Sequence, residues 1–166
     1  MIALINNTFK KKATLLVFIY FVSLAVFSQS KISIYKIEDL INRIEKNNDT
    51  LYVVNFWATW CKPCVAELPD FEKVNNEFKV QKVKVLLVSM DFKEEIDKRV
   101  LPFISKNNYS TEVVLLDETN GDFINKIHSD WSGAIPATLL IKNSKKIFIP
   151  KKINYEELKT KIISSQ

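Results

Sequence analysis

Residues 51–64 read LYVVNFWATWCKPC and place an apolar run directly before a pair of cysteines. The run Leu51 to Trp57 is rich in residues that favour strands, as is typical of a strand buried on both faces of a sheet. Cys61 and Cys64, the only cysteines of the chain, follow where we expect a helix to begin. Two thiols separated by two residues at such a strand-to-helix junction can cycle between a dithiol and a disulfide. The stretch therefore predicts thiol–disulfide exchange.

A helix that begins near Cys61 favours the thiolate form of this residue. The first backbone N–H groups of a helix have no intrahelical partner, and the helix end carries about half a positive charge. Cysteines so placed have a pKa lowered from about 8.5 into roughly the 3.5–7.5 range. Pro63 is compatible with a first helical turn, and Lys62 adds a nearby cation. We expect Cys61 to be the attacking nucleophile, and the more buried Cys64 to resolve the mixed disulfide.

Two other interpretations of the cysteine pair remain open on the residues alone. A Cys-x-x-Cys pair often forms half of a zinc site, but a structural zinc ion normally takes four ligands. The chain has no second cysteine pair and a single histidine, His128, so we expect no metal. A purely structural disulfide across two residues would close a very small loop and would gain little entropy.

The order of apolar segments predicts an α/β fold in a single domain. The chain has 166 residues, of which 47% are hydrophobic. Strands are expected at 32–35, 51–57, 83–90, 113–116, 137–141 and 147–149, and helices at 37–47, 61–78, 94–106, 122–127 and from 155 onward. Alternating strands and helices predict a central mixed β-sheet flanked by helices on both faces, with parallel central strands. The last two strands are expected to form an antiparallel hairpin around residues 143–145.

The N-terminal segment has the pattern of a secretory signal peptide. Three lysines at 10–12 precede fifteen uncharged residues at 13–27, and small polar residues follow at 28–30. We expect residues 1–28 to be a leader, cleaved before Gln29, and residues 29–166 to form the domain. An uncleaved membrane anchor is the alternative, although fifteen residues fall short of the roughly 20 that a spanning helix needs. The formal net charge of the chain is +5, and three of its lysines lie in the leader, which has no acidic residue. Residues 29–166 therefore carry a net charge of only +2. This charge does not indicate nucleic-acid binding.

The sequence FWATWCKPC at residues 56–64, followed by ELP at 67–69, resembles the thioredoxin superfamily. More closely, it is similar to the exported TlpA-like thiol–disulfide oxidoreductases, which include the cytochrome c maturation reductases. The resemblance implies a thioredoxin-like fold. It also implies that Pro136 is the cis-proline that faces the cysteine pair. A cis bond there would expose the backbone of Ile135 for pairing with an extended substrate chain, and Trp60 would lie partly exposed beside Cys61.

The same resemblance implies roles for two polar residues near the cysteines. Asn55 occupies the place where cytosolic thioredoxins carry a buried aspartate that accepts a proton, which an asparagine cannot do. Glu67 matches the glutamate that TlpA-like proteins use near the thiols. A carboxylate close to two thiols would raise their pKa by like-charge repulsion, against the effect of the helix end. For Glu67 the alternative is a solvent-facing helix residue, and for His128 we expect a structural or surface role.

The resemblance implies an exported disulfide reductase that works outside the cytoplasm, in the periplasm or cell envelope. Its partners would be protein disulfide or dithiol substrates and a membrane electron carrier that restores the dithiol, and it would need no cofactor. Two alternatives remain open: an oxidase that donates its disulfide, and a binding module that keeps the fold without turnover.

Overall fold

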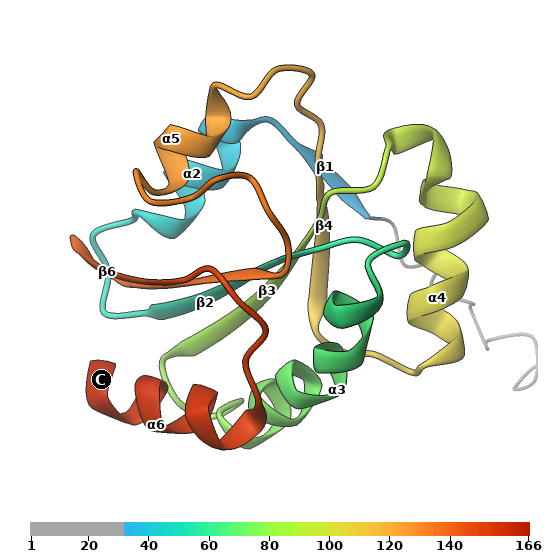
Figure 1. Ribbon diagram of the computed structural model, residues 1–166. Coiled ribbons are helices and arrows are strands. Elements are labelled where there is room, and N and C mark those ends of the chain that lie inside the picture. The colour runs from blue at the N-terminus through green and yellow to red at the C-terminus, as the bar shows by residue number, and fades with distance from the viewer. Residues whose placement is uncertain (1–31) are drawn as a thin grey trace, which may run out of the picture. The chain divides into compact units, whose positions relative to one another are not determined.

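The computed structural model describes residues 32–166, so the expected leader at 1–28 lies outside the described residues (Figure 1). Its strands are β1 (Ser33–Tyr35), β2 (Leu51–Trp57), β3 (Val83–Ser89), β4 (Glu112–Leu116), β5 (Ala137–Lys142) and β6 (Lys145–Ile149). Its α-helices are α2 (Ile37–Ile44), α3 (Lys62–Glu77), α4 (Leu101–Lys106), α5 (Phe123–Ile127) and α6 (Tyr155–Ser165). This is the predicted order of strands and helices.

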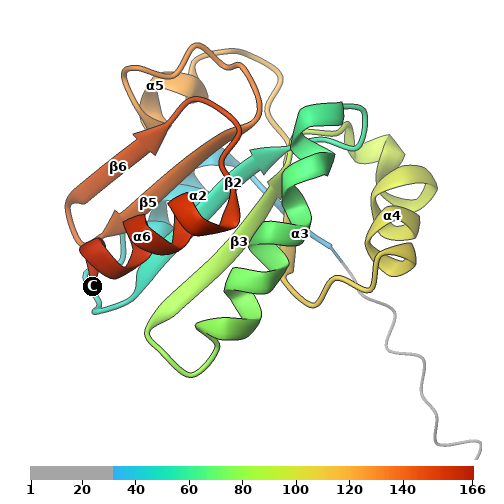
Figure 2. The same cartoon turned by 60° about the horizontal axis from the view of Figure 1, so that its bottom comes forward.

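The described strands form one mixed sheet in the order β1-β4-β3-β2-β5-β6, of which Figure 2 shows β3, β2, β5 and β6 side by side. The strands β1, β4, β3 and β2 run parallel to one another, whereas β5 is antiparallel to β2 and β6 is antiparallel to β5. The strand β2 pairs along its whole length with β3, and all seven of its residues are buried. The sequence prediction of parallel central strands and an antiparallel terminal hairpin is therefore confirmed.

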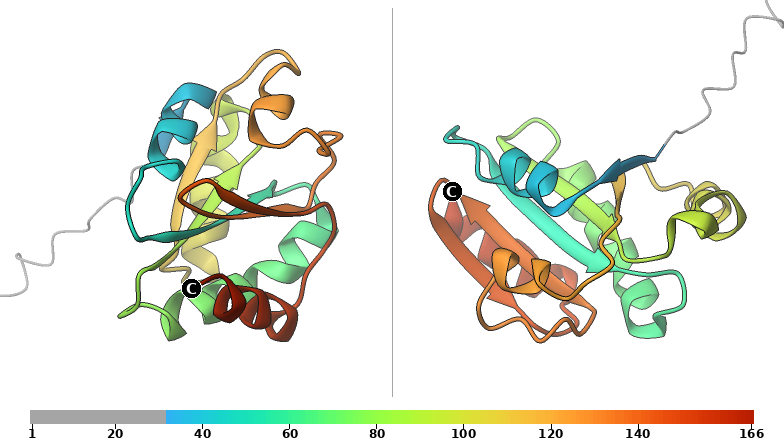
Figure 3. Two further views of the ribbon diagram at one scale, coloured as in Figure 1. Left: turned by 90° about the vertical axis from the view of Figure 1, so that its left-hand side faces the viewer. Right: turned by 90° about the horizontal axis from the view of Figure 1, so that it is seen from above.

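Helices cover both faces of the sheet, so the core consists of two layers. Figures 1 and 3 show α2 and α5 on one face, and α3 and α6 on the other. Alternate residues of β2 supply the two layers: Val53 and Trp57 pack with α3 and α6, whereas Val54 and Phe56 pack with α2 and α5. The predicted α/β thioredoxin-like architecture, with helices on both faces, is confirmed.

The segment predicted as one helix at 94–106 has three parts. A 3₁₀ turn (Lys93–Glu95) leads into a π-helical turn (Ile96–Val100), and α4 follows. Pro102 lies in the first turn of α4. Proline cannot donate a backbone hydrogen bond, and its ring clashes with the carbonyl four residues earlier, which here is that of Lys98. A proline within the helix predicted at 94–106 is expected to bend or restart it, and the structure shows a change of helical pitch directly before Pro102.

The turn of the terminal hairpin consists of two residues, Asn143 and Ser144. The strand β5 ends at Lys142 and β6 begins at Lys145. Asn143 has a φ of 53°, a left-handed conformation that asparagine tolerates better than most residues. The last strand is thus two residues longer than the sequence pattern predicted.

None of the helices within residues 32–166 is both long and apolar enough to cross a lipid bilayer.

Leu68 fills the layer between α3 and the sheet and is fully buried. We predict that Leu68→Ala lowers the free energy of unfolding by about 2–5 kcal/mol, because the lost methyl groups leave a cavity in the core. The measurement is equilibrium denaturation in urea. Val80, which is 94% exposed, provides the matched control. Val80→Ala is expected to change stability by less than about 0.5 kcal/mol, and equal effects of the two substitutions would contradict the described packing.

Candidate active site

Cys61 is the N-cap residue of α3, directly after the short loop that leaves β2. The amide of Cys61 donates to the carbonyl of Ala58 at 3.1 Å, which closes a turn before the helix. The amide of Cys64 donates to the Sγ of Cys61 at 3.3 Å, so a helical N–H group points at this sulfur. The two cysteines form a disulfide, with their Cα atoms 5.3 Å apart. The predicted strand-to-helix placement of the pair is confirmed.

The two sulfurs differ in their surroundings. Cys64 is fully buried, whereas Cys61 retains 6% exposure at the surface. Next to it, Trp60 is 60% exposed, while Trp57 at the end of β2 is fully buried and packs against Phe103 at a ring distance of 5.4 Å. An attacking partner can therefore approach Cys61 but not Cys64.

The loop before β5 brings Ile135 and Pro136 opposite the disulfide. The Ile135–Pro136 peptide bond is cis, as the resemblance implies. The carbonyl oxygen of Ile135 lies 3.8 Å from the Sγ of Cys61. The Nε1 of Trp131 donates to the carbonyl of Ala134 at 2.8 Å and so anchors this loop to the core. The main chain of Ile135 thus borders the more exposed sulfur.

Glu67 is fully buried on the inner face of α3, which excludes the alternative of a solvent-facing helix residue. Its Oε1 accepts a hydrogen bond from the Nδ2 of Asn55 at 2.8 Å, and its Oε2 accepts from the amide of Ile153 at 2.9 Å. The same Nδ2 of Asn55 lies 3.2 Å from the Oγ1 of Thr138 on β5. These contacts join β2, α3, β5 and the loop before α6 in one buried hydrogen-bond network.

Burial raises the pKa of Glu67 above its ordinary value, because a low-dielectric environment disfavours the charged form. The hydrogen bonds from the Ile153 amide and from Asn55, and the positive charge of Lys152, act in the opposite direction. Glu67 lies three residues after Cys64, which places the two side chains on the same face of the helix. Glu67 is therefore a buried carboxyl group with little solvent screening, about one helical turn after Cys64.

Sequence reasoning missed a second polar cluster, centred on Asp91. This residue is buried, and its carboxylate accepts from the Thr59 amide at 3.0 Å, from the Thr59 hydroxyl at 2.6 Å and from the Ser89 hydroxyl at 2.8 Å. The cluster fixes the loop that carries Trp60 and Cys61 to the end of β3. Asp91 lies two residues after the end of a buried strand. This position is only a weak signal of a functional role, because aspartate is common in the loops that follow strands.

Lys62 and Pro63, the residues between the cysteines, are both exposed at the start of α3. His128 does not reach this site. Its ring stacks on Phe148 at 4.7 Å, which agrees with the structural role expected for it. Within residues 32–166, no three His, Cys, Asp or Glu side chains gather as metal ligands would.

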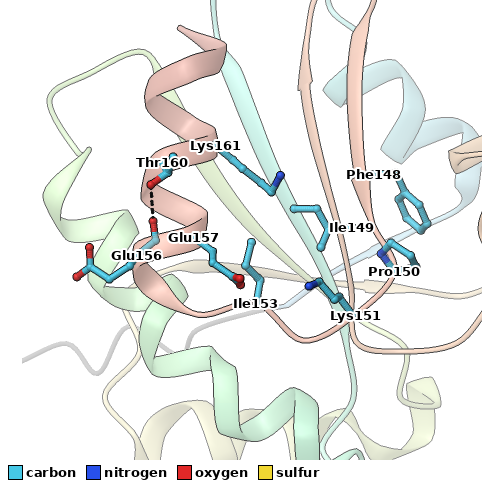
Figure 4. Close-up of a pocket in the computed structure, with 9 residues that line it drawn as sticks. All are labelled: Phe148, Ile149, Pro150, Lys151, Ile153, Glu156, Glu157, Thr160 and Lys161. Carbon is cyan, nitrogen blue, oxygen red and sulfur yellow. Dashed lines mark hydrogen bonds between the residues drawn. The ribbon is translucent and has the colours of Figure 1, made fainter.

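A pocket of about 600 Å³ lies between β6 and α6 rather than beside the disulfide (Figure 4). It is lined by Phe148, Ile149, Pro150, Lys151, Ile153, Glu156, Glu157, Thr160 and Lys161. Ile153 lines this pocket, and its backbone amide also donates the hydrogen bond to Glu67. None of the site residues predicted from the sequence lines this pocket.

Known proteins with similar sequences and structures include several named for disulfide chemistry. The chain is 37% identical over 73 residues to the thioredoxin-like protein YneN of Bacillus subtilis, a match that covers 43% of this chain and 42% of that protein. It is 35% identical over 92 residues to the thiol-disulfide oxidoreductase ResA of Oceanobacillus iheyensis, covering 54% of this chain and 43% of that protein. The matched regions thus span less than half the length of these two relatives.

Among solved structures, the thiol:disulfide interchange protein of the thioredoxin family from Chlorobium tepidum superposes with a TM-score of 0.59 at 18% identity, covering 75% of this chain and 83% of that one. A likeness at this identity shows the thioredoxin-like fold. The family model described as "AhpC/TSA family" matches residues 30–148, from before β1 into β6. Because this match extends over most of the chain and includes both the cysteine pair and the cis-proline loop, the protein belongs to the AhpC/TSA family of thioredoxin-like proteins.

Proposed function

We propose that the protein is a thiol–disulfide oxidoreductase that acts as a disulfide reductase through Cys61 and Cys64. The observation that carries this proposal is the disulfide at the N-terminus of α3, with its more exposed sulfur facing Ile135. The names of the relatives, thiol-disulfide oxidoreductase among them, support the same chemistry. A binding module without turnover would not require two cysteines in this geometry.

The proposed cycle begins with the dithiol form. The Cys61 thiolate attacks one sulfur of a substrate disulfide, which forms a mixed disulfide and releases the first substrate thiolate. The Cys64 thiolate then attacks the Sγ of Cys61, which releases the second substrate thiolate and forms the disulfide seen here. The substrate gains two electrons and, on protonation, two protons. A membrane electron carrier must return two electrons to the protein for the next cycle.

The buried Glu67 favours the reductase over the oxidase. A strong oxidant owes its potential to a stabilised reduced form, in which the attacking cysteine is held as a thiolate. A nearby carboxylate opposes that stabilisation by like-charge repulsion. We expect a redox potential nearer to the value of about −270 mV known for thioredoxin than to the value of about −120 mV of a strong oxidant. Equilibration with glutathione and dithiothreitol buffers measures it.

We propose an extracytoplasmic location, in the periplasm or cell envelope. The proposal rests on the leader-like pattern of residues 1–28, with a cleaved signal peptide preferred over a short anchor. Outside the cytoplasm, protein disulfides form and persist, so a reductase there has a supply of substrates. We propose that the substrate chain pairs with the backbone at Ile135 and packs on Trp60, and that cytochrome c maturation is one process that would use such a reductase.

The two cysteines have separable roles in the proposed cycle. We predict that Cys64→Ser accumulates mixed disulfides with substrate, because the resolving thiol is lost, and that Cys61→Ser accumulates none. Both variants should lose more than about 99% of insulin-disulfide reduction, since the exchange needs both sulfurs. Non-reducing electrophoresis detects the adducts. Adducts on Cys61→Ser alone would mean that the nucleophile is Cys64.

Glu67 is expected to hold the thiols of the reduced protein in their protonated form. Removal of its charge in Glu67→Gln should lower the pKa of the reactive thiol, so that the pH profile of iodoacetamide alkylation moves to lower pH by about half a unit or more. Mass spectrometry follows the reaction. Glu156→Gln, at an exposed position of α6, is the matched control and should leave the profile unchanged. An unchanged profile in Glu67→Gln would remove Glu67 from the site.

A further inference from the structure

A second pocket, of about 470 Å³, opens next to the residue that precedes Cys61. It is lined by Trp60, Asp91, Phe92, Glu94, Glu95 and Arg99. The lining comes from the loop before α3, from Asp91 and Phe92 after β3, and from the 3₁₀ and π-helical turns that follow them. The pocket is therefore built by two segments that the Asp91 hydrogen bonds hold together.

Two aromatic side chains of the pocket face solvent. Trp60 is 60% exposed and Phe92 is 77% exposed, although both are large apolar groups that normally bury most of their surface. Exposed aromatic side chains that share one pocket are typical of a surface that binds another molecule. Their ring faces also attract cations, because the π system places negative charge there.

The charges of the pocket are mainly negative. Asp91, Glu94 and Glu95 contribute three carboxylates against the one guanidinium of Arg99, which pairs with Glu95. Glu94 is exposed and forms no ion pair with any side chain of residues 32–166. Lys93, the neighbouring cation, lies 3.8 Å from Asp117 and does not line the pocket. A pocket with this balance attracts cations and repels anions.

We propose that this pocket binds a lysine or arginine side chain of the polypeptide substrate, close in sequence to the substrate cysteine that is joined to Cys61. The proposal rests on the proposed function, because the mixed disulfide holds the substrate chain next to Trp60. One residue of extended chain spans about 3.3–3.6 Å, so residues that flank the substrate cysteine reach the pocket. The aliphatic stem would lie on Trp60 and Phe92, and the charged head would face Glu94.

The proposal names a class of substrate: disulfides in a positively charged sequence context. Neutral apolar side chains could occupy the aromatic part of the pocket but would leave Glu94, which forms no ion pair within residues 32–166, without a partner. Acidic side chains would be repelled. The predicted order of preference for the residue beside the substrate cysteine is therefore lysine first, then glutamine or leucine, and glutamate last.

The test uses four peptide disulfides that differ only in that flanking residue, which is lysine, glutamine, leucine or glutamate. For the purified protein we expect kcat/KM to be about two- to five-fold higher for the lysine peptide than for the glutamine peptide. The preference should shrink in about 1 M salt, where the screening length falls to about 3 Å. Equal values for the four peptides, or the highest value for leucine, would overturn the proposal.

Two variants locate the preference in the pocket. Glu94→Gln should lower the ratio of kcat/KM between the lysine and glutamine peptides, and Glu94→Lys should abolish or reverse this preference. Glu156→Lys, a charge reversal at an exposed position of α6, is the matched control and should keep the preference. A lysine preference that survives Glu94→Lys would refute the assignment. If the unmodified protein reduces none of the peptides, the proposed function itself fails, and that result is distinct from reduction without preference.

Discussion

The hydrogen bond from Asn55 to Glu67 is the interaction on which the arrangement of the site depends. Burial of a carboxylate is unfavourable unless donors satisfy its oxygens, and here Asn55 and the amide of Ile153 each satisfy one of them. These two donors come from β2 and from the loop before α6, and Glu67 comes from α3. The requirement to pair one buried carboxylate thus ties β2, α3 and the loop before α6 together.

The second constraint acts on the loop that carries Cys61. The parallel register places Trp57 opposite Ser89, so β2 and β3 end side by side. Residues just beyond the two strand ends are therefore neighbours, and Asp91 reaches the amide and hydroxyl of Thr59. Rigid positioning of this loop matters for the proposed exchange, because attack on a disulfide requires the incoming sulfur to approach along a defined direction. The same contact also shapes the pocket between Trp60 and Phe92.

The sequence was most informative where the chemistry and the local structure share the same residues. The cysteine pair, the strand before it and the order of elements followed from apolar patterning and from the spacing of Cys61 and Cys64. Helical spacing alone could not show that Glu67 is buried, because a glutamate on a helix is usually exposed. The Asp91 cluster escaped prediction because Thr59, one of its partners, lies 32 residues away in the chain and meets Asp91 only through the strand register. The π-helical turn before Pro102 likewise depends on how the helix accommodates that proline against the core.

The two outer strands of the described sheet bear on the behaviour of the protein at high concentration. An open strand edge can pair with another molecule and begin aggregation. Here β1 has only three residues, and β6 begins with two exposed lysines, Lys145 and Lys146, of which Lys146 pairs with Glu45. Lysine side chains on an outer strand disfavour pairing with a second copy edge to edge. Both edges therefore disfavour edge-to-edge self-association, and the proposed pairing of a substrate chain at Ile135 uses the loop before β5 rather than either outer strand.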